Sequence, residues 1–291
     1  MASIPSIQLS DGNAIPLIGF GIGTAWYKKE EGAIDFAVVD GVKAAIQAGY
    51  THLDTAEVYH TESELGMAIA ESSVARSSLF ITTKVMKGID NIAQSFEKSL
   101  KNLRLDYVDL YLIHAPFFAK SEEQLQMAWK ELEAIKASGR AKSIGVSNFL
   151  PADLLAILKT AKIRPSINQV EFHPYLQHQS LQKFHKEQNI ALAGYAPLTA
   201  VTNYRPGLLD TTYARLADKY KKTEGEIALR WVMDQGIVVI TTSQKETRMK
   251  EYLGALNFKL TQEEVKEIAE LGEKKHIRAF WTDKYNADDT S

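Results

Sequence analysis

A regular alternation of short apolar runs with longer helical patterns constrains the fold of this chain more than any other feature. The apolar runs, which read as strands, cover residues 18–21, 50–54, 79–84, 108–114, 141–146, 167–171, 190–195 and 237–240. Helical patterns lie between them at residues 36–48, 63–71, 91–103, 122–137, 152–160, 180–188 and 213–235. In the pattern at 122–137, apolar residues recur at spacings of three and four, which is typical of an amphipathic helix that packs on a core.

Strict alternation of strands and helices predicts parallel strands that are joined by right-handed crossovers. Such strands form either an open doubly wound sheet or a closed barrel. No linker rich in Pro, Gly or Ser divides the 291 residues, and a barrel of eight strand–helix units takes about 250 residues as one domain. We therefore predict an α/β fold, a (β/α)8 TIM barrel, with residues 1–291 forming a single domain.

Two segments lie outside the alternation. Residues 6–18 contain two apolar runs around Ser10-Asp11-Gly12-Asn13, and Asp-Gly between apolar runs is a strong hairpin signal. We expect this β-hairpin to close the bottom of the barrel. The C-terminal tail, residues 272–291, is short, which predicts a small specificity loop and an open cleft.

Composition excludes several classes of function. The 34 Lys and Arg balance 36 Asp and Glu, for a net charge of −2, so nothing favours a nucleic-acid or membrane partner. Cysteine is absent, which excludes disulfides, thiolate metal sites and cysteine nucleophiles. No apolar run approaches the roughly 18 residues that span a bilayer, and the N-terminal sequence has no signal-peptide pattern. We expect a soluble, cytoplasmic protein.

Polar residues interrupt the apolar runs at their carboxyl ends, where TIM barrels carry their reactive groups. Asp54, Lys84 and His114 end three strands, and Tyr59 follows in a loop. A buried lysine is costly unless it is paired, and Asp54 is the obvious partner. Three other strands end in polar or aromatic residues, namely Ser147 with Asn148, Gln169 with Glu171, and Tyr195.

Together these groups indicate proton chemistry at a carbonyl. A tyrosine with a pKa of about 10 is a poor acid at neutral pH, but a nearby ammonium lowers that pKa. Asp54 would hold Lys84 in place, and His114 could orient the substrate oxygen. The reaction would need a separate hydride source, because side chains cannot supply one.

Metal chemistry is an alternative interpretation. His52 and Asp54 lie two residues apart on one strand face, as ligands do in barrel hydrolases. That site would need further ligands. Glu57 and His173 are available but fall in no recognisable ligand spacing, so no metal is expected.

At these residues the sequence resembles the aldo-keto reductase superfamily over nearly the whole chain. The blocks that carry the resemblance are Leu53-Asp54-Thr55-Ala56-Glu57-Val58-Tyr59, Thr83-Lys84, Leu112-Ile113-His114, Ile144-Gly145-Val146-Ser147-Asn148-Phe149 and Asn168-Gln169-Val170-Glu171. The resemblance implies NADPH-dependent reduction of a carbonyl to an alcohol, with Asp54, Tyr59, Lys84 and His114 as the catalytic residues and Tyr59 as the general acid. It implies that the cofactor is bound by Thr24, Asp54, Ser147, Asn148, Gln169, Tyr195, Leu198, Ser243, Lys245, Arg248 and Glu251.

One departure from the family pattern concerns the cofactor. The family's adenosine block has a lysine before its serine, whereas this chain has Thr242 before Ser243. Lys245 and Arg248 could reach the 2′-phosphate from the same loop. We therefore predict that NADPH is preferred over NADH. The Thr-Thr-Ser variant of this block, with Gly23-Thr24-Ala25-Trp26-Tyr27, is similar to fungal ketoamide and conjugated-polyketone reductases.

Aromatic residues in two loops are the expected walls of the substrate pocket: Trp26, Tyr27, Phe117 and Phe118, with Phe280 and Trp281 as additions from the tail. Such walls suit a compact apolar or cyclic carbonyl compound, and an aldehyde, an α-keto amide, a diketone or a keto lactone would all fit. We expect a monomer that acts on a small molecule. A non-catalytic or accessory NADP-binding subunit stays open as an alternative, because some relatives of the superfamily have such roles.

Overall fold

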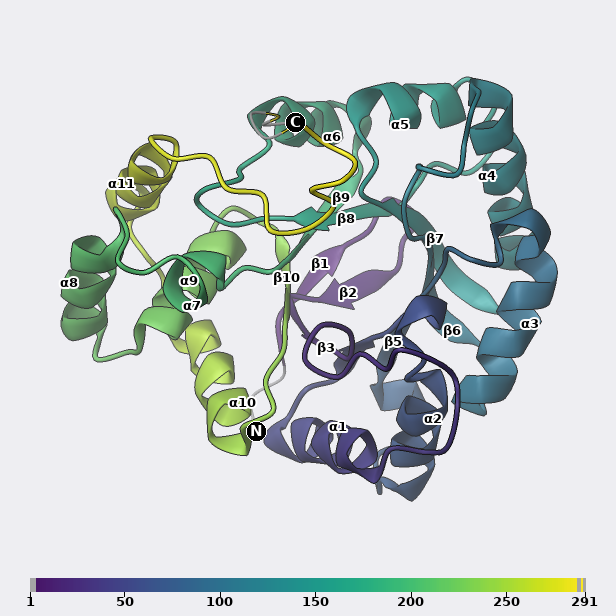
Figure 1. Ribbon diagram of the computed structural model, residues 1–291, viewed down its shortest axis with the longest axis horizontal. Coiled ribbons are helices and arrows are strands. Elements are labelled where there is room, and N and C mark those ends of the chain that lie inside the picture. Colours follow the sequence, from purple (N-terminus) through teal and green to yellow (C-terminus); the bar gives the residue numbers. More distant parts are fainter. Residues whose placement is uncertain (1–3, 287–288, 290–291) are drawn as a thin grey trace.

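The computed structural model describes residues 4–286 and 289, and within this part eight parallel strands close into a barrel (Figure 1). Around the barrel the strand order is β10-β3-β4-β5-β6-β7-β8-β9. The strands are β3 (Ile18–Gly21), β4 (His52–Asp54), β5 (Phe80–Val85), β6 (Val108–Ile113), β7 (Ala141–Ser147), β8 (Ile167–Glu171), β9 (Ala191–Tyr195) and β10 (Val238–Thr241). Each lies within about two residues of a strand that the sequence predicts, and the (β/α)8 barrel is confirmed.

Helices surround the barrel on its outer side (Figure 1). They are α1 (Phe36–Ala48), α2 (Glu62–Glu71), α3 (Ile92–Leu103), α4 (Glu122–Ala137), α5 (Pro151–Leu158), α6 (Gln179–Gln188), α7 (Thr199–Thr202), α8 (Asp210–Tyr220), α9 (Glu224–Met233), α10 (Glu246–Leu253) and α11 (Gln262–Gly272). Among the described residues, no helix combines the length and the apolar composition needed to cross a membrane.

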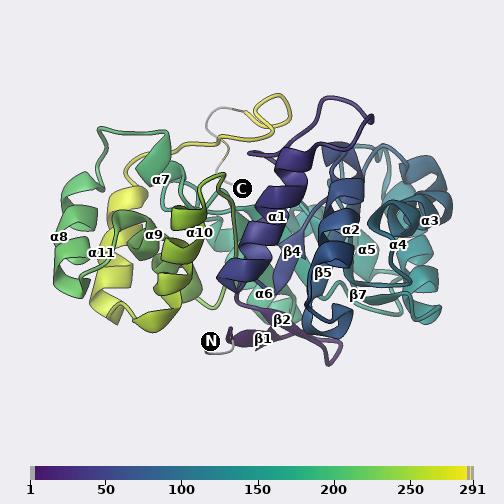
Figure 2. The same ribbon diagram turned by 90° about the horizontal axis from the view of Figure 1, so that it is seen from below.

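The predicted N-terminal hairpin is also confirmed. Strands β1 (Ser6–Gln8) and β2 (Ala14–Pro16) pair antiparallel and lie at one end of the barrel, while the C-terminal segment lies at the other (Figure 2). Leu9 and Ile15 belong to the hydrophobic cluster that fills the barrel interior. The hairpin therefore closes the bottom of the barrel, although residue 18 belongs to the first barrel strand and not to the hairpin.

The hydrophobic core has two parts, because side chains along each strand alternate between the barrel interior and the surrounding helices. Along β6, Leu110 and Leu112 belong to the interior cluster, whereas Tyr111 and Ile113 belong to the larger cluster between the barrel and its helices. Successive side chains of a strand point to opposite faces, so a strand that is buried on both faces carries an almost continuous apolar run. This is why the sequence shows the barrel strands so clearly.

The prediction of one helix over residues 213–235 is wrong. The structure has two helices there, α8 and α9, separated by Lys221 in the left-handed conformation at φ 54°. Thr223 then begins α9 with a capping box, in which its hydroxyl accepts from the Glu226 amide and the Glu226 carboxylate accepts from the Thr223 amide. The cap satisfies amides that would otherwise lack partners at the start of the helix.

Candidate active site

A cavity of about 830 Å³ opens at the carboxyl ends of the barrel strands. It is lined by three of the predicted catalytic residues, Asp54, Tyr59 and His114. Ten of the predicted cofactor residues line it as well: Thr24, Asp54, Ser147, Asn148, Gln169, Tyr195, Leu198, Ser243, Lys245 and Arg248. Parallel strands bring residues that are distant in sequence to this one end of the barrel.

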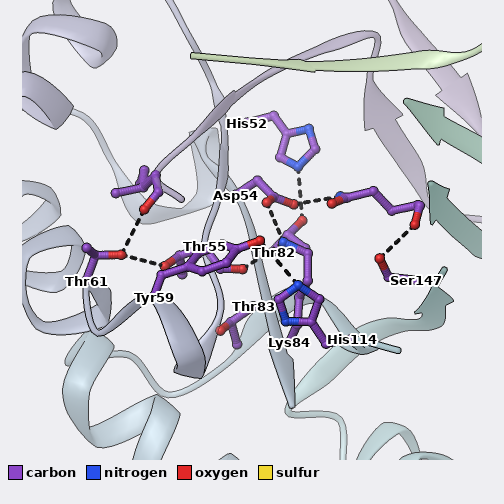
Figure 3. Close-up of polar contacts among 12 residues, drawn as sticks. His52, Asp54, Thr55, Tyr59, Thr61, Thr82, Thr83, Lys84, His114 and Ser147 are labelled. Carbon is purple, nitrogen blue, oxygen red and sulfur yellow. Dashed lines mark hydrogen bonds and ion pairs between the residues drawn. The ribbon is translucent and has the colours of Figure 1, made fainter. Parts of the chain in front are cut away.

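The ion pair of Lys84 with Asp54 lies in the barrel wall beside the cavity (Figure 3). Lys84, on β5, is fully buried, and its Nζ lies 2.5 Å from Asp54 Oδ1 and 3.0 Å from the carbonyl oxygen of Thr55. Gln169 Nε2 donates to the other carboxylate oxygen of Asp54 at 2.8 Å. A buried charge pair is tolerated when such additional hydrogen bonds satisfy it, so the pair is held rigidly.

Tyr59 ends a 3₁₀ turn, Glu57–Tyr59, and faces this pair. Its hydroxyl lies 3.3 Å from His114 Nε2, and Lys84 Nζ lies 5.2 Å from the centre of its ring. Gly23 lies directly against the tyrosine, because a Cβ at residue 23 would come within 2.8 Å of the ring. Glycine at this position therefore leaves room for the ring to reach His114.

Burial decides the protonation states of these groups. Burial raises the pKa of Tyr59 above its ordinary value, and the Lys84 ammonium only partly opposes this rise. The net lowering of the Tyr59 pKa that the sequence led us to expect is therefore not found. Burial disfavours the charge on Lys84, but the interactions with Asp54 and Tyr59 together outweigh it and raise the pKa of the lysine. Burial, with a smaller contribution from Lys84, holds the pKa of His114 well below its ordinary value. At neutral pH the tyrosine is protonated, the lysine is charged and the histidine is neutral.

A chain of hydrogen bonds fixes the polar residues beside Tyr59. Ser147 donates from Oγ to the carbonyl oxygen of Gln169 at 2.7 Å. Asn148, in the left-handed conformation at φ 60°, donates to the carbonyl oxygen of His114 and accepts from the Tyr195 hydroxyl at 2.8 Å. The ring of Tyr195 and the amide side chains of Asn148 and Gln169 are thus preorganised at the cavity wall.

Farther along the cavity the wall offers groups that suit a nucleotide. Within the part of the chain that the structure describes, the buried hydroxyls of Thr241 and Thr242 have no hydrogen-bond partner. Both residues line the cavity with Lys245 and Arg248. Buried hydroxyls of this kind are normally satisfied, and an anionic ligand with polar groups would satisfy them. The residues present therefore fit a phosphorylated dinucleotide.

Four predicted binding residues are not part of the cavity lining. Glu251 instead accepts a hydrogen bond from Thr223 Oγ1 at 2.8 Å. Trp26 is 9% exposed and packs on α1, where a Cβ at residue 41 would overlap its ring. Phe118 packs against the hydrophobic core, and Phe117 contacts Trp281 at 5.0 Å between ring centres. These aromatic residues pack within the protein, whereas Tyr27 does line the cavity.

Sequence reasoning missed several residues of the wall, among them Val58, Met86, Gln244 and Tyr252. Val58 directly precedes Tyr59, and Met86 directly follows β5, so nearness to a strand end could have identified both. Tyr252 directly follows the predicted cofactor residue Glu251, and this position could have identified it. The structure places Phe280 and Trp281 in the wall, in line with the suggestion from sequence.

The alternative of a metal site receives no support from this geometry. Within residues 4–286 and 289, no group of three or more His, Asp or Glu side chains is arranged to hold a metal ion. His52 Nε2 lies 3.0 Å from the Thr82 hydroxyl, and His173 Nε2 lies 2.8 Å from Glu171. Both histidines therefore have protein partners.

Comparisons with known proteins agree with this geometry. Residues 18–273 match the model of the aldo/keto reductase family. The chain is 41% identical over 272 residues to an NAD/NADP-dependent indole-3-acetaldehyde reductase of Schizosaccharomyces pombe, covering 92% of this chain and 96% of the relative. It is 40% identical over 296 residues to an NADPH-dependent alpha-keto amide reductase of Saccharomyces cerevisiae, covering 95% and 94% of the two chains. The resemblance to fungal reductases is confirmed.

A solved structure resembles this one over almost its full length. The crystal structure of a Bombyx mori aldo-keto reductase in complex with NADP has a TM-score of 0.86 at 35% identity and covers 99% of both chains. A match of this extent, together with the family model, shows the relationship directly. The chain belongs to the aldo/keto reductase family.

Proposed function

We propose that the protein reduces an aldehyde or ketone to an alcohol with NADPH, and that Tyr59 is the general acid. The observation that carries the proposal is the position of the Tyr59 hydroxyl, 3.3 Å from His114 Nε2 and beside the buried pair of Lys84 and Asp54. The yeast relatives, which are an aldehyde reductase and an α-keto amide reductase by name, support the same chemistry.

Each of the four residues has one task in this reaction. NADPH, when bound, supplies a hydride to the carbonyl carbon. Tyr59 donates its proton to the carbonyl oxygen, and the charged Lys84 stabilises the phenolate that is left. Neutral His114 holds the carbonyl oxygen near the tyrosine, while Asp54 keeps the lysine charged and in place.

The cofactor is proposed to lie along the cavity. Ser147, Asn148 and Gln169 would hydrogen-bond the nicotinamide amide, and the ring of Tyr195 would stack on the nicotinamide. Thr24 and Leu198 would lie near the ribose and pyrophosphate, and Ser243 near the adenosine. Lys245 and Arg248 would bind the 2′-phosphate, which favours NADPH over NADH. Glu251, which the sequence also predicts to bind the cofactor, is not kept in the proposal, because it bonds Thr223 and lies outside the wall.

The substrate end of the cavity is largely apolar. Val58, Met86, Tyr27, Phe280 and Trp281 contribute to the wall. An apolar wall with a few fixed polar groups selects a compact, uncharged carbonyl compound. We therefore propose aldehydes, α-keto amides, diketones and keto lactones as the substrate class.

A spectrophotometric screen tests the proposal. NADPH oxidation is followed with a panel of aldehydes, keto amides, keto esters, keto acids and cyclic diketones, without added metal. We expect turnover of several neutral carbonyls and quenching of tryptophan fluorescence by NADPH. Quenching without turnover of any compound would favour the accessory role, and absence of both would contradict the proposal.

The monomeric state, the cytoplasmic location and the single domain over residues 1–291 stay predictions. Light scattering coupled to gel filtration tests the first, since a monomer has a mass of 32.5 kDa. Localisation of a tagged full-length chain tests the second. A single cooperative unfolding transition, observed by two probes, tests the third.

A further inference from the structure

Glu171 is a buried carboxylate to which the proposed reaction assigns no task. It ends β8 and is 1% exposed. Oε1 accepts a hydrogen bond from the Ala279 amide at 2.8 Å, and Oε2 accepts one from the Phe280 amide at 3.0 Å. His173 Nε2 lies 2.8 Å from Oε1. A barrel strand thus binds two consecutive backbone amides of a segment more than one hundred residues later in the chain.

That segment, residues 273–286, follows the last helix and contains no helix or strand. A further hydrogen bond anchors the segment two residues before Ala279, where the amide of Ile277 donates to the carbonyl oxygen of Tyr175 at 3.1 Å. A carboxylate that accepts from two backbone amides makes charge-assisted hydrogen bonds, which are stronger than those between neutral groups. Glu171 is therefore a strong acceptor for the amides of Ala279 and Phe280.

Phe280 and the residue that follows it, Trp281, contribute two side chains to the cavity wall. The Phe280 ring lies 5.4 Å from Tyr195, edge to face, and the Trp281 ring lies 6.2 Å from His114. Trp281 also has φ 59°, a left-handed conformation that a bulky residue adopts only when its surroundings impose it. The hydrogen bonds to the two preceding amides fix the backbone that enters this strained residue.

We infer that Glu171 is a positioning residue for the substrate site. It holds the C-terminal segment so that Phe280 and Trp281 form one wall of the cavity above Tyr59 and His114. This inference rests on the proposed function only for its effect on substrate. The position of the segment is a property of the protein without cofactor.

The replacement Glu171→Gln tests the inference with little change of shape. An amide side chain offers a single acceptor oxygen and turns a donor toward one of the two backbone amides. Three of the four tryptophans, Trp26, Trp129 and Trp231, are at most 9% exposed, so acrylamide quenching of fluorescence reports mainly on Trp281. We expect the quenching constant to rise by about twofold in the variant as the segment opens locally. An unchanged constant would overturn the inference.

Kinetics supply a second readout. A wall that contacts substrate equally in the ground and transition states affects KM more than kcat. For the best neutral carbonyl substrate of the screen we expect KM to rise about tenfold in Glu171→Gln, with kcat and the affinity for NADPH nearly unchanged. A loss confined to kcat or to NADPH binding would show that Glu171 acts on the barrel instead.

A cycle of combined variants tests whether Glu171 affects KM through the wall or through the barrel. If Glu171 acts through the wall, adding Glu171→Gln to the pair Phe280→Ala and Trp281→Ala raises KM no further, whereas independent effects would multiply and contradict the inference. If Glu171→Gln does not fold, Ala279→Pro removes one donor from the other side and should raise the quenching constant in the same way. If the wild type reduces no carbonyl, the proposed function fails, but the quenching measurement still tests the role of Glu171.

Discussion

At the scale of single residues, burial and a neighbouring charge have opposite effects on the pKa of the Tyr59 hydroxyl. Burial raises the pKa of the tyrosine, and the Lys84 ammonium lowers it by less. The tyrosine therefore keeps its proton at neutral pH, as a general acid must before it protonates the carbonyl oxygen. The nearby lysine then acts mainly after proton transfer, when it stabilises the phenolate.

Replacing Tyr59 by Phe removes this proton and leaves the ring in place. We expect kcat for ketone reduction to fall by about 10³-fold, the usual range for loss of a general acid. The Kd for NADPH, measured by tryptophan fluorescence, should change little, because the hydroxyl bonds His114 and no predicted cofactor residue. Retained turnover in this variant would reject Tyr59 as the acid.

Coenzyme preference is a second property of single residues. Replacing Arg248 by Ala should raise KM for NADPH about tenfold or more and leave KM for NADH nearly unchanged, because only NADPH carries the 2′-phosphate. Lys250→Ala is the matched control, since Lys250 lies on the same helix but outside the cavity wall. Equal effects of Arg248→Ala on both coenzymes would contradict the assignment.

The sequence predicted the residues at strand ends better than those in loops. Asp54, Lys84 and His114 interrupt apolar runs, so the barrel topology alone brings them together. Trp26 carries no such signal, because its packing on Gly41 depends on how a loop folds over a helix. Glu251 was predicted to bind the cofactor, but it bonds Thr223 instead, and this contact between the start of α9 and α10 has no signal in the sequence either.

At the scale of elements, the eight strands were predictable because their apolar runs are distinct from the helical patterns. The boundary between α8 and α9 was harder to see, since apolar residues continue at helical spacing on both sides of it. Its signal was the sequence Thr223-Glu224-Gly225-Glu226, which is a capping box. Periodicity alone does not show a break when two successive helices bury the same face.

Close contact between neighbouring helices predicts the effect of one glycine. Gly66 lies in α2, where alanine would ordinarily be more stable by about 1 kcal/mol. A Cβ at this position, however, would overlap the backbone carbonyl oxygen of Leu103 on α3. We expect Gly66→Ala to lower the free energy of unfolding by about 2 kcal/mol, because backbone moves less readily than a side chain.

The control for this prediction is Gly32→Ala, because, apart from its chain neighbours, no atom of the described residues lies within 4 Å of a Cβ at residue 32. Its free energy of unfolding, measured in urea, should stay within about 0.5 kcal/mol of the wild-type value. If Gly66→Ala were as stable as this control, the helices would be able to separate at little cost.

At the scale of the whole molecule, the two ends of the barrel have different tasks. The hairpin closes the end that carries the amino ends of the strands, and the C-terminal segment lies by the cavity at the other end (Figure 2). In TIM barrels, residues at the amino ends of the strands contribute mainly to stability, whereas changes in the loops at the carboxyl ends alter substrate specificity. The stability of the fold at acid pH does not depend on one end of the barrel, because it is set by buried titratable groups in several elements.

Two buried histidines predict how stability depends on pH. Burial lowers the pKa of His52, in β4, to about 4, and that of His185, in α6, also to about 4. In the unfolded chain both have a pKa of about 6.5. Between these values the unfolded chain binds protons that the folded protein does not, so stability is complete above pH 6.5 and falls as the pH decreases toward 4. We expect each histidine to remove about 2 kcal/mol of unfolding free energy between pH 7 and pH 4.5.

Urea unfolding at pH 7 and pH 4.5 measures this loss in the wild type and in His52→Gln and His185→Gln. Each variant should lose less stability on acidification than the wild type, and this comparison cancels any loss that is independent of pH. Equal losses in all three proteins would show that other groups control the acid limit.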